Sequence, residues 1–384
     1  MSTDRFTEVT RESWFGRIGN AIKGMVVGVV LFAVAFPLLF WNEGRAVKTY
    51  KTLKEGGRAV VSVASDSIVP ANEGRLIHVT GKADTAETLT DSVFGLSANA
   101  LRLRRVVEMY QWRQESDSKT TKKVGGAKET VTTYTYRKAW SDRPIDSAQF
   151  KEPAGHTNPG ALPYEATAQN ARRVTLGAFV LSPSLVGKIH DFETLPVPAD
   201  MALPGSIREK AKVHDAGFYI GADPASPKVG DARVKIEVVR PLPVSVLAKQ
   251  SGDTFAPYVA KAGGTIELLQ SGEHAAAAMI QQAQESNRVL TWILRLLGFI
   301  LMFAGLNMVL KPLSVIADFL PIMGNIVAAG TGIVSFAAAA IFALVTIAVA
   351  WIVYRPVWGC VLILIAAGVA VAVKGRLKSA KATP

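Results

Sequence analysis

Residues 24–41 read Gly-Met-Val-Val-Gly-Val-Val-Leu-Phe-Ala-Val-Ala-Phe-Pro-Leu-Leu-Phe-Trp and contain no charged side chain. A helix rises about 1.5 Å per residue, so about 20 apolar residues cross the hydrocarbon core of a bilayer. The Ala-Val-Ala sequence at 33–35 resembles the cleavage site of a signal peptide, but it lies inside the apolar run. We therefore expect an uncleaved membrane span at residues 24–41.

The C-terminal part of the chain contains more apolar sequence than a single span needs. Residues 289–310 carry one charge, Arg295, and the 55 residues from 319 to 373 also carry one, Arg355. The second run fits two spans, and Tyr354-Arg355-Pro356 is the expected break, because proline lacks the N–H that a continuing helix needs. We predict spans at 289–310, 332–353 and 357–373, with a cytoplasmic or interfacial link at 311–331.

Basic residues near the chain ends predict the orientation. Residues 1–23 contain four Lys or Arg, and the tail at 374–384 contains four with no acidic residue. Lys and Arg in short segments favour the cytoplasmic side, and four spans place both ends on the same side. Residues 42–272 are then expected in the periplasm or in the lumen of the endoplasmic reticulum. The chain's single cysteine, Cys360, lies outside that region, so the region must fold without disulfides.

The extramembrane region has the pattern of strands. Alternating or β-branched runs at 103–112, 129–140 and 232–240 are the strongest of these, and Pro and Gly punctuate the sequence between them. The period changes at residue 273, where an Ala- and Gln-rich helical run leads without a breaker into the second span. We predict one helix over 273–310. The expected fold is a multi-pass α-helical membrane protein with four spans and a large β-rich α+β domain inserted between spans 1 and 2.

Charge and motifs exclude several classes of function. The chain has 43 Lys plus Arg against 31 Asp plus Glu, a net charge of +12. Because its ends are apolar spans with basic flanks, we interpret this charge as a membrane signal and expect no nucleic-acid partner. The five histidines are dispersed and have no second ligand at metal-binding spacing. We predict no metal site, no cofactor and no catalytic residues from local motifs.

Polar and small residues in the spans are the candidate structural and interaction sites, since polar groups are costly in lipid. Arg295 either reaches the interface or pairs within the bundle, and Asn307 is expected to hydrogen-bond between helices. Gly298 and Gly305 allow close helix packing, either within the monomer or with other membrane proteins. The repeated Asn-Glu-Gly-Arg at 42–45 and 72–75 is interpreted as turn chemistry. The full set of candidates is Asn42, Glu43, Gly44, Arg45, Arg295, Gly298, Gly305, Asn307, Tyr354, Arg355 and Pro356.

Eight segments along the chain resemble the transmembrane protein 43 (LUMA) family in matching order. The first is Trp-Asn-Glu-Gly-Arg-Ala-Val-Lys-Thr at 41–49, and the last is Trp-Ile-Val-Tyr-Arg-Pro at 351–356. The others lie at 72–79, 103–112, 155–159, 229–234, 251–254 and 302–307. The resemblance implies four spans with a large lumenal or periplasmic domain between the first and second. It brings no established catalytic residues.

The resemblance also implies a class of function. Eukaryotic members reside in the endoplasmic reticulum and inner nuclear membrane, associate with themselves, and are linked to lamins and emerin. The short basic tail and the Ala- and Arg-rich composition favour a bacterial member in the inner membrane, where those two partners are absent. We therefore expect a non-enzymatic scaffold whose partners are membrane lipids, itself and other membrane proteins. An envelope hydrolase built on the β-rich domain and a small channel or transport accessory are the alternatives.

Overall fold

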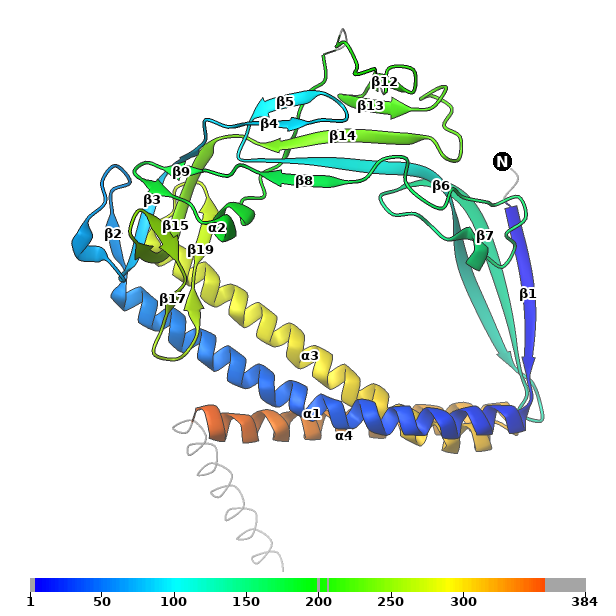
Figure 1. The fold of residues 1–384 in the computed structure, drawn as a ribbon. Helices are drawn as coiled ribbons and strands as arrows, with labels where there is room; N and C mark the ends of the chain where they lie inside the picture. Colours follow the sequence, from blue (N-terminus) through cyan, green and yellow to red (C-terminus); the bar gives the residue numbers. More distant parts are fainter. Residues whose placement is uncertain (1–3, 199–200, 206, 356–384) are drawn as a thin grey trace, which may run out of the picture.

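The structure is a computed structural model that describes residues 4–198, 201–205 and 207–355. Three helices in it are long and apolar enough to cross a membrane: α1 (Trp14–Ala59), α3 (Ala276–Ala317) and α4 (Pro321–Tyr354). They lie together along the base of the molecule, and a β-rich domain arches over them (Figure 1). The predicted β-rich domain and the membrane helices are thus present. The fourth predicted span, 357–373, lies outside the described residues.

Helix α1 is far longer than the apolar run that predicted it. Ser13 caps its N-terminus, since the Ser13 hydroxyl accepts a hydrogen bond from the Gly16 amide at 3.2 Å. The helix then continues for 46 residues through Pro37 and through Asn-Glu-Gly-Arg at 42–45. The turn interpretation of 42–45 is therefore wrong. It is right for the second copy, where Pro70–Asn72 form a 3-10 turn and Gly74 has φ +74°.

Helix α3 runs antiparallel to α1 and packs closely along it. A Cβ built on Gly28 of α1 would lie 2.6 Å from the carbonyl oxygen of Gly305, and one on Gly305 would lie equally close to the carbonyl oxygen of Gly28. Gly298 faces Leu39 in the same way. Both glycines of α3 that the sequence singled out therefore serve packing within the monomer.

The connection between α3 and α4 is shorter than the expected link at 311–331. Helix α3 continues through Pro312 to Ala317, and α4 starts at Pro321. Only residues 318–320 lie between the helices, because Pro321 fits the first turn of a helix but cannot continue the previous one. We call residues 318–320 the elbow. The predicted span 332–353 is the C-terminal part of this longer helix.

The domain contains two large sheets and two small ones. The eight-stranded sheet has the order β1-β7-β6-β14-β13-β12, with β8 pairing β6 and β11 pairing β14. The seven-stranded sheet has the order β19-β15-β16-β10-β9-β3-β2, and β15 also pairs β3. The first sheet comprises Asp4–Glu12 (β1), Arg102–Lys122 (β6), Lys128–Ser141 (β7), Thr167–Asn170 (β8), Glu193–Thr194 (β11), Ala211–His214 (β12), Gly217–Ile220 (β13) and Ala232–Val239 (β14).

The second sheet comprises Val61–Val63 (β2), Leu76–Asp84 (β3), Thr175–Leu176 (β9), Phe179–Val180 (β10), Leu242–Ser251 (β15), Thr254–Ala256 (β16) and Leu268–Ser271 (β19). The small sheets pair Thr88–Asp91 (β4) with Leu96–Asn99 (β5), and Tyr258–Val259 (β17) with Thr265–Ile266 (β18). Short helical segments are Pro70–Asn72 (η1), Ser147–Gln149 (η2) and Pro183–Gly187 (α2).

Strand β6 belongs to two parts of the fold. Its first residues, 102–109, pair with β14 inside the domain, and residues 109–122 pair with β7 in a long hairpin that extends away from it. Strand β1 adds a third strand to this hairpin, with Asp4 opposite Tyr136 and Glu12 opposite Lys128. The N-terminal segment, expected as a basic cytoplasmic flank of the first span, is thus an edge strand of the large sheet in residues 4–12.

Two apolar clusters lie in the domain, and one of them connects it to the helices. The main core lies between the sheets and includes the fully buried Phe94, Phe179 and Phe218. A second cluster joins Leu53 of α1 and Ile280 of α3 to strand residues of the domain such as Leu76. Burying side chains of this size contributes about 1.5–3 kcal/mol each. The domain is therefore fixed to the end of the α1–α3 pair by a packed core.

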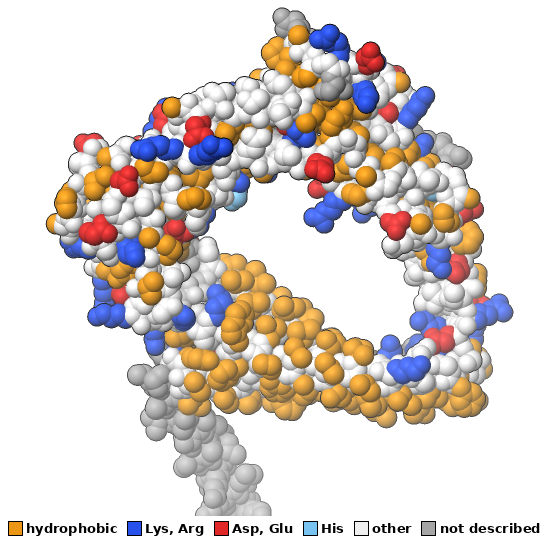
Figure 2. Space-filling model, in the orientation of Figure 1, with side chains coloured by type: hydrophobic (Ala, Val, Ile, Leu, Met, Phe, Trp, Pro, Cys, Tyr) orange, Lys and Arg blue, Asp and Glu red, His pale blue; other side chains and the backbone are white. Residues whose placement is uncertain are grey.

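The molecule closes into a ring. The domain meets the C-terminal end of α1 on one side, and the β1-β7-β6 hairpin descends to the other end of the helices (Figure 1). With side chains drawn, an opening remains through the middle (Figure 2). The ring has two closures, the packed core near Leu53 and the contact between the hairpin tip and the elbow.

We expect Gly305→Val to destabilise the helical base, because the new side chain would meet the α1 backbone at Gly28. Overpacking of this kind costs about 1–3 kcal/mol. Thermal unfolding of the full-length protein in detergent measures the loss. Gly19→Val is the matched control, since a Cβ there meets nothing within 4 Å and the residue is exposed. Equal effects of both substitutions would contradict the packing argument.

Candidate functional site

The most distinctive side-chain group in the structure is a buried ion pair between α1 and α3. Both carboxylate oxygens of Glu43 accept hydrogen bonds from the Arg295 guanidinium, at 2.6 Å to Nε and 2.9 Å to the terminal nitrogen. The indole Nε1 of Trp351, near the end of α4, donates to the same carboxylate at 2.8 Å. Glu43 is 0% exposed. One carboxylate therefore joins all three long helices.

This geometry decides between the two interpretations of Arg295. The guanidinium pairs within the bundle, and it also lies 4.9 Å from the ring centroid of Trp292. Removing two charges from water is expensive, and a bidentate pair with further hydrogen bonds is the arrangement that offsets the cost. Glu43 meets this condition because each of its oxygens has a donor.

A second set of hydrogen bonds continues the pairing of α1 and α3. The Asn42 amide nitrogen donates to the backbone oxygen of Thr291 at 3.0 Å. Arg45 donates to the side-chain oxygens of Asn287, at 2.9 Å, and Thr291, at 3.0 Å. Asn287 donates in turn to the backbone oxygen of Ala46 at 3.0 Å. We call Asn42, Glu43, Arg45, Asn287, Thr291, Arg295 and Trp351 the junction cluster.

The remaining sequence candidates are placed around the junction cluster or outside it. Gly44 faces the Tyr354 ring so closely that a Cβ would lie 2.6 Å from the ring carbon Cζ. Arg355 stacks on Trp351, with its guanidinium carbon 5.5 Å from the ring centroid. The Asn307 side chain is half-buried, and the hydrogen bonds found among the described residues do not include it. Pro356 lies outside the described residues.

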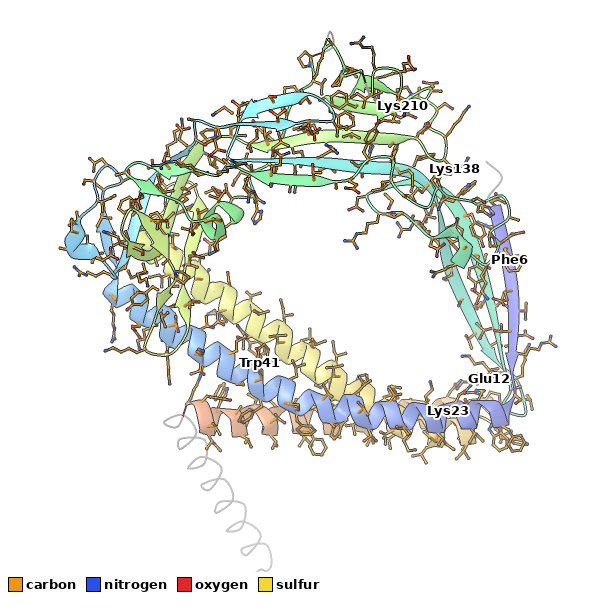
Figure 3. The ribbon with its side chains drawn as sticks, viewed as in Figure 1. Phe6, Glu12, Lys23, Trp41, Lys138 and Lys210 are labelled. Atoms are coloured by element: carbon orange, nitrogen blue, oxygen red, sulfur yellow. The ribbon has the colours of Figure 1, made fainter. Side chains whose placement is uncertain are left out.

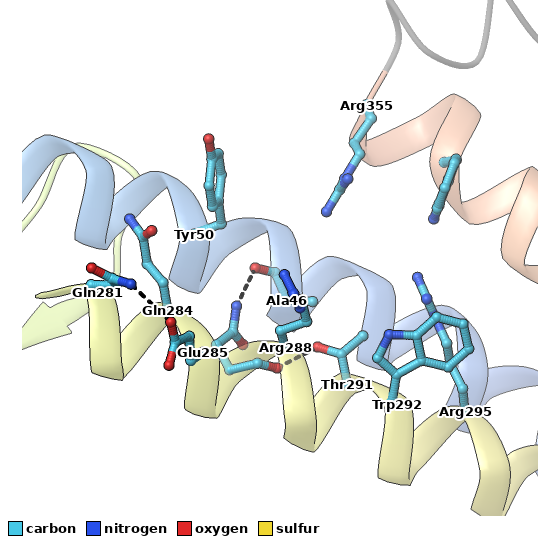
Figure 4. Close-up of a pocket in the computed structure, with 12 residues that line it drawn as sticks. Ala46, Tyr50, Gln281, Gln284, Glu285, Arg288, Thr291, Trp292, Arg295 and Arg355 are labelled. Atoms are coloured by element: carbon cyan, nitrogen blue, oxygen red, sulfur yellow. Dashed lines mark hydrogen bonds between the residues drawn. The ribbon is translucent and has the colours of Figure 1, made fainter.

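A groove of about 410 Å³ lies beside the junction cluster, between α1, α3 and the end of α4. Figure 4 shows Arg288, Arg295 and Arg355 around it, with the Trp292 ring beside Arg295. Glu285 and Gln281 lie at the end nearer the domain. The groove is thus basic and aromatic where the helices leave the apolar part of the base.

The elbow holds a second buried carboxylate. Asp318 is 1% exposed and accepts hydrogen bonds from Arg17 of α1 and from Lys122 at the hairpin tip, the latter at 2.6 Å. Arg17 also donates to the backbone oxygen of Gly126 in the hairpin turn. Trp14 donates to the backbone oxygen of Val315 at 2.8 Å. We call Arg17, Lys122 and Asp318 the elbow cluster.

One histidine of the domain, His78, is buried and has structural partners. His78 is 8% exposed, its Nε2 lies 2.8 Å from the backbone oxygen of His274, and its Nδ1 lies 3.3 Å from the Ser62 hydroxyl. Burial lowers the pKa of His78, and the hydrogen bond to the His274 carbonyl opposes that shift in part. The neutral ring therefore donates from Nε2 and accepts at Nδ1.

Neither alternative function gains a site from these positions. A hydrolase needs a nucleophile, a base and an orienting group around a space for substrate. Ser62 and His78 touch, but neither lines the groove beside the junction cluster or three other grooves among the described residues. Within the described ranges, no group of three His, Cys, Asp or Glu side chains is placed to bind a metal ion. Arg295 and Asp318, two charged residues of the helical base, belong to separate clusters and are both paired.

Comparison with known proteins identifies the family to which the chain belongs. The family profile described as transmembrane protein 43 matches residues 109–356, which include most of the domain, α3 and α4. The chain belongs to the transmembrane protein 43 family. It is 34% identical to transmembrane protein 43 of Rattus norvegicus over 375 residues, which cover 93% of this chain and 91% of the relative.

Two further relatives agree with this assignment. Transmembrane protein 43 of Homo sapiens is 34% identical, with 89% of this chain and 87% of the relative covered. The transmembrane protein 43 homolog of Drosophila melanogaster is 30% identical, with 88% and 90% covered. No solved structure gives a significant match. This chain is therefore an integral membrane protein of the transmembrane protein 43 family.

Sequence reasoning identified four of the seven residues of the junction cluster. It singled out Asn42, Glu43, Arg45 and Arg295, but not Asn287, Thr291 and Trp351. Asn287 and Thr291 could have been identified from the sequence of α3, because they and Arg295 are spaced by four residues and so lie on one helix face. Arg17 gave no signal, because its partners are remote in sequence.

We expect Glu43→Gln to destabilise the full-length protein by about 1–3 kcal/mol, because the largely buried Arg295 guanidinium, which borders the groove, then loses its countercharge. Denaturant unfolding in detergent micelles measures the change. The double variant Glu43→Gln/Arg295→Met should recover much of the loss, since it removes both charges. A double variant as unstable as Glu43→Gln would show that the charge pairing is not the cause.

The lowered pKa of His78 predicts that stability falls in acid. Between the ordinary His value, about 6.5, and the lower folded value, the unfolded chain binds a proton that the folded chain does not. The free energy of unfolding should therefore decrease as pH falls below about 6.5 and level off below the folded pKa. Thermal midpoints across this range, compared for wild type and His78→Gln, test it. The exposed His214→Gln should keep the wild-type profile.

Proposed function

We propose that this protein is a non-enzymatic membrane scaffold that associates with itself and organises membrane proteins or lipid domains, with the bacterial inner membrane as its location. The observation that supports this most directly is the outward face of α4. That face carries exposed apolar residues one or two turns apart: Ile326, Gly330, Ile333, Ala337, Ile341 and Leu344.

This face of α4 can pack against a second helix as well as against lipid. A Cβ built on Gly330 or Gly332 would meet nothing within 4 Å, whereas Gly298 and Gly305 are filled by α1. Small residues let two helix backbones approach closely, and dispersion contacts then favour association in lipid. The small residues of α3 are used within the monomer, and those of α4 remain for a partner.

The rest of the molecule suits a scaffold as well. Helices α1 and α3 carry the junction cluster at mid-length and the packed core near Leu53 at the domain end. The domain therefore keeps a fixed orientation to the helices. An α4-mediated assembly of such units would present the domains in a regular array, which is what organising other membrane components requires.

Disulfide trapping in native membranes tests the self-association. In a Cys360→Ala background, Ala337→Cys is placed on the outward face of α4, and Ala339→Cys, which is 0% exposed, is the matched control. We expect a cross-linked dimer for Ala337→Cys but not for Ala339→Cys. Adding Gly330→Leu should weaken the dimer band. Monomer for both cysteines, or equal dimer for both, would contradict association through this face.

A further inference from the structure

The three long helices change between apolar and polar sequence at one place, beside the junction cluster. Helix α1 carries no charge over residues 24–41, and charged residues follow directly. Helix α3 is rich in polar side chains up to Arg288 and mostly apolar after it. Helix α4 carries no charge before its end at Tyr354. The groove beside the junction cluster is lined by residues from all three transitions, among them Ala46, Arg288 and Arg355.

Large aromatic side chains gather at the same place. Trp292 and Trp351 line this groove. Trp41 and Tyr354 line a second groove, formed mainly by α1 and the end of α4, and Figure 3 labels Trp41 on α1. Trp and Tyr are enriched where the headgroups of a bilayer meet its hydrocarbon. The groove therefore lies at the depth of the lipid phosphates.

Three arginines line the groove, and their donors are only partly used. Arg288 is exposed, and neither it nor Arg355 has a salt bridge or a side-chain hydrogen bond to another described residue. Arg355 instead stacks on the ring of Trp351. Arg295 donates to Glu43 from Nε and from one terminal nitrogen, and its other terminal nitrogen makes no hydrogen bond within the described ranges. The groove thus offers guanidinium donors from two helices to an anion.

The charges around the groove leave one positive charge in excess. Arg288, Arg295 and Arg355 supply three positive charges. Glu285 in the lining and Glu43, which is paired with Arg295, supply two negative ones. A phosphodiester carries a single negative charge, and the planar guanidinium fork matches the geometry of its oxygens. The groove therefore fits the phosphate of a phospholipid in both charge and donor type.

The exposed side of α3 next to the groove fits an acyl chain. Arg288, Trp292, Leu296 and Ile300 follow one another at intervals of four residues and form a continuous stripe on the helix. Trp292 is 62% exposed, Leu296 58% and Ile300 47%. The stripe runs from a cation through an aromatic ring to aliphatic side chains. A phospholipid at a membrane interface has the same order of phosphate, interfacial region and acyl chain.

The end of the groove nearer the domain indicates the class of headgroup. Gln281, Gln284 and Glu285 line this end, and their side-chain oxygens can accept hydrogen bonds from hydroxyl groups beyond a lipid phosphate (Figure 4). Lys48 and Lys51 of the second groove lie on the same turns of α1 as Ala46 and Tyr50 of the first. Basic side chains at a membrane surface attract anionic lipids in preference to zwitterionic ones.

We propose that this groove binds the headgroup of an anionic phospholipid of the phosphatidylglycerol type, with one acyl chain along the stripe on α3. Arg288 and Arg355 donate to the phosphate oxygens from two different helices, and Arg295 adds its remaining nitrogen. The bound lipid then connects α3 to the end of α4. A single copy of the chain supplies every contact, so the site is independent of association through α4.

Native mass spectrometry of the full-length protein in detergent micelles measures the binding, with phosphatidylglycerol and phosphatidylcholine as the probes. We expect Arg288→Gln/Arg355→Gln to bind phosphatidylglycerol about tenfold more weakly than wild type, because two charge-assisted contacts are lost. Arg5→Gln/Lys210→Gln is the matched control, since it removes the same charge at exposed positions of the β-rich domain, where Figure 3 labels Lys210. Unchanged binding by the groove variant, or equal binding of both lipids by wild type, would overturn the proposal.

Thermal unfolding provides a second readout and distinguishes lipid from free phosphate. A ligand that binds the folded state raises the unfolding midpoint. Phosphatidylglycerol should raise the wild-type midpoint above its value in phosphatidylcholine, and the groove variant should lose this rise. The variant should keep the wild-type midpoint in phosphatidylcholine, because its two arginines pair with none of the described side chains. A rise of equal size with the same concentration of inorganic phosphate would indicate a free-phosphate site and would contradict the assignment to lipid.

Discussion

The antiparallel packing of α1 on α3 is the constraint on which the rest of the structure depends. Apolar helices in lipid gain little from contacting each other rather than lipid tails, so small residues and hydrogen bonds have to set their register. Gly28 and Gly305 let the two helix backbones approach closely at one point, and the Glu43–Arg295 pair fixes a second contact nearer the domain. A slip of one turn would leave the buried Glu43 carboxylate without its cation, which is far more costly than losing apolar contact.

The positions of the domain and of α4 follow from this register of α1 and α3. Leu53 and Ile280 lie close together where the two helices reach the domain, and they close the packed core there. Trp351 reaches Glu43 only if α4 lies in the angle between α1 and α3. The junction cluster therefore fixes three helices with one carboxylate, and the fixed helices in turn hold the domain at one end.

Local patterns predicted the strands well but missed the features that depend on remote partners. The runs at 129–140 and 232–240 alternate clearly and form β7 and β14, because their pattern reflects a half-buried sheet. Strand β1 has no such signal, since it is largely exposed and pairs only with a hairpin more than a hundred residues away. Asn-Glu-Gly-Arg at 42–45 has turn-like residues, yet it is helical because Asn42, Glu43 and Arg45 all find partners on α3.

Two buried carboxylates, one at mid-length and one at the far end of the base, perform different tasks. Glu43 joins helices to helices, so its pairing is satisfied whether or not the hairpin touches the base. Asp318 joins α1 and the elbow to the hairpin tip, and its second cation, Lys122, comes from a strand of the domain. A buried carboxylate with only Arg17 as partner would lose one charge-assisted hydrogen bond while keeping its desolvation cost. Asp318 therefore stabilises the closed ring relative to an open one. Because its carboxylate binds a cation from the hairpin, the contact between the hairpin tip and the elbow is part of the folded state.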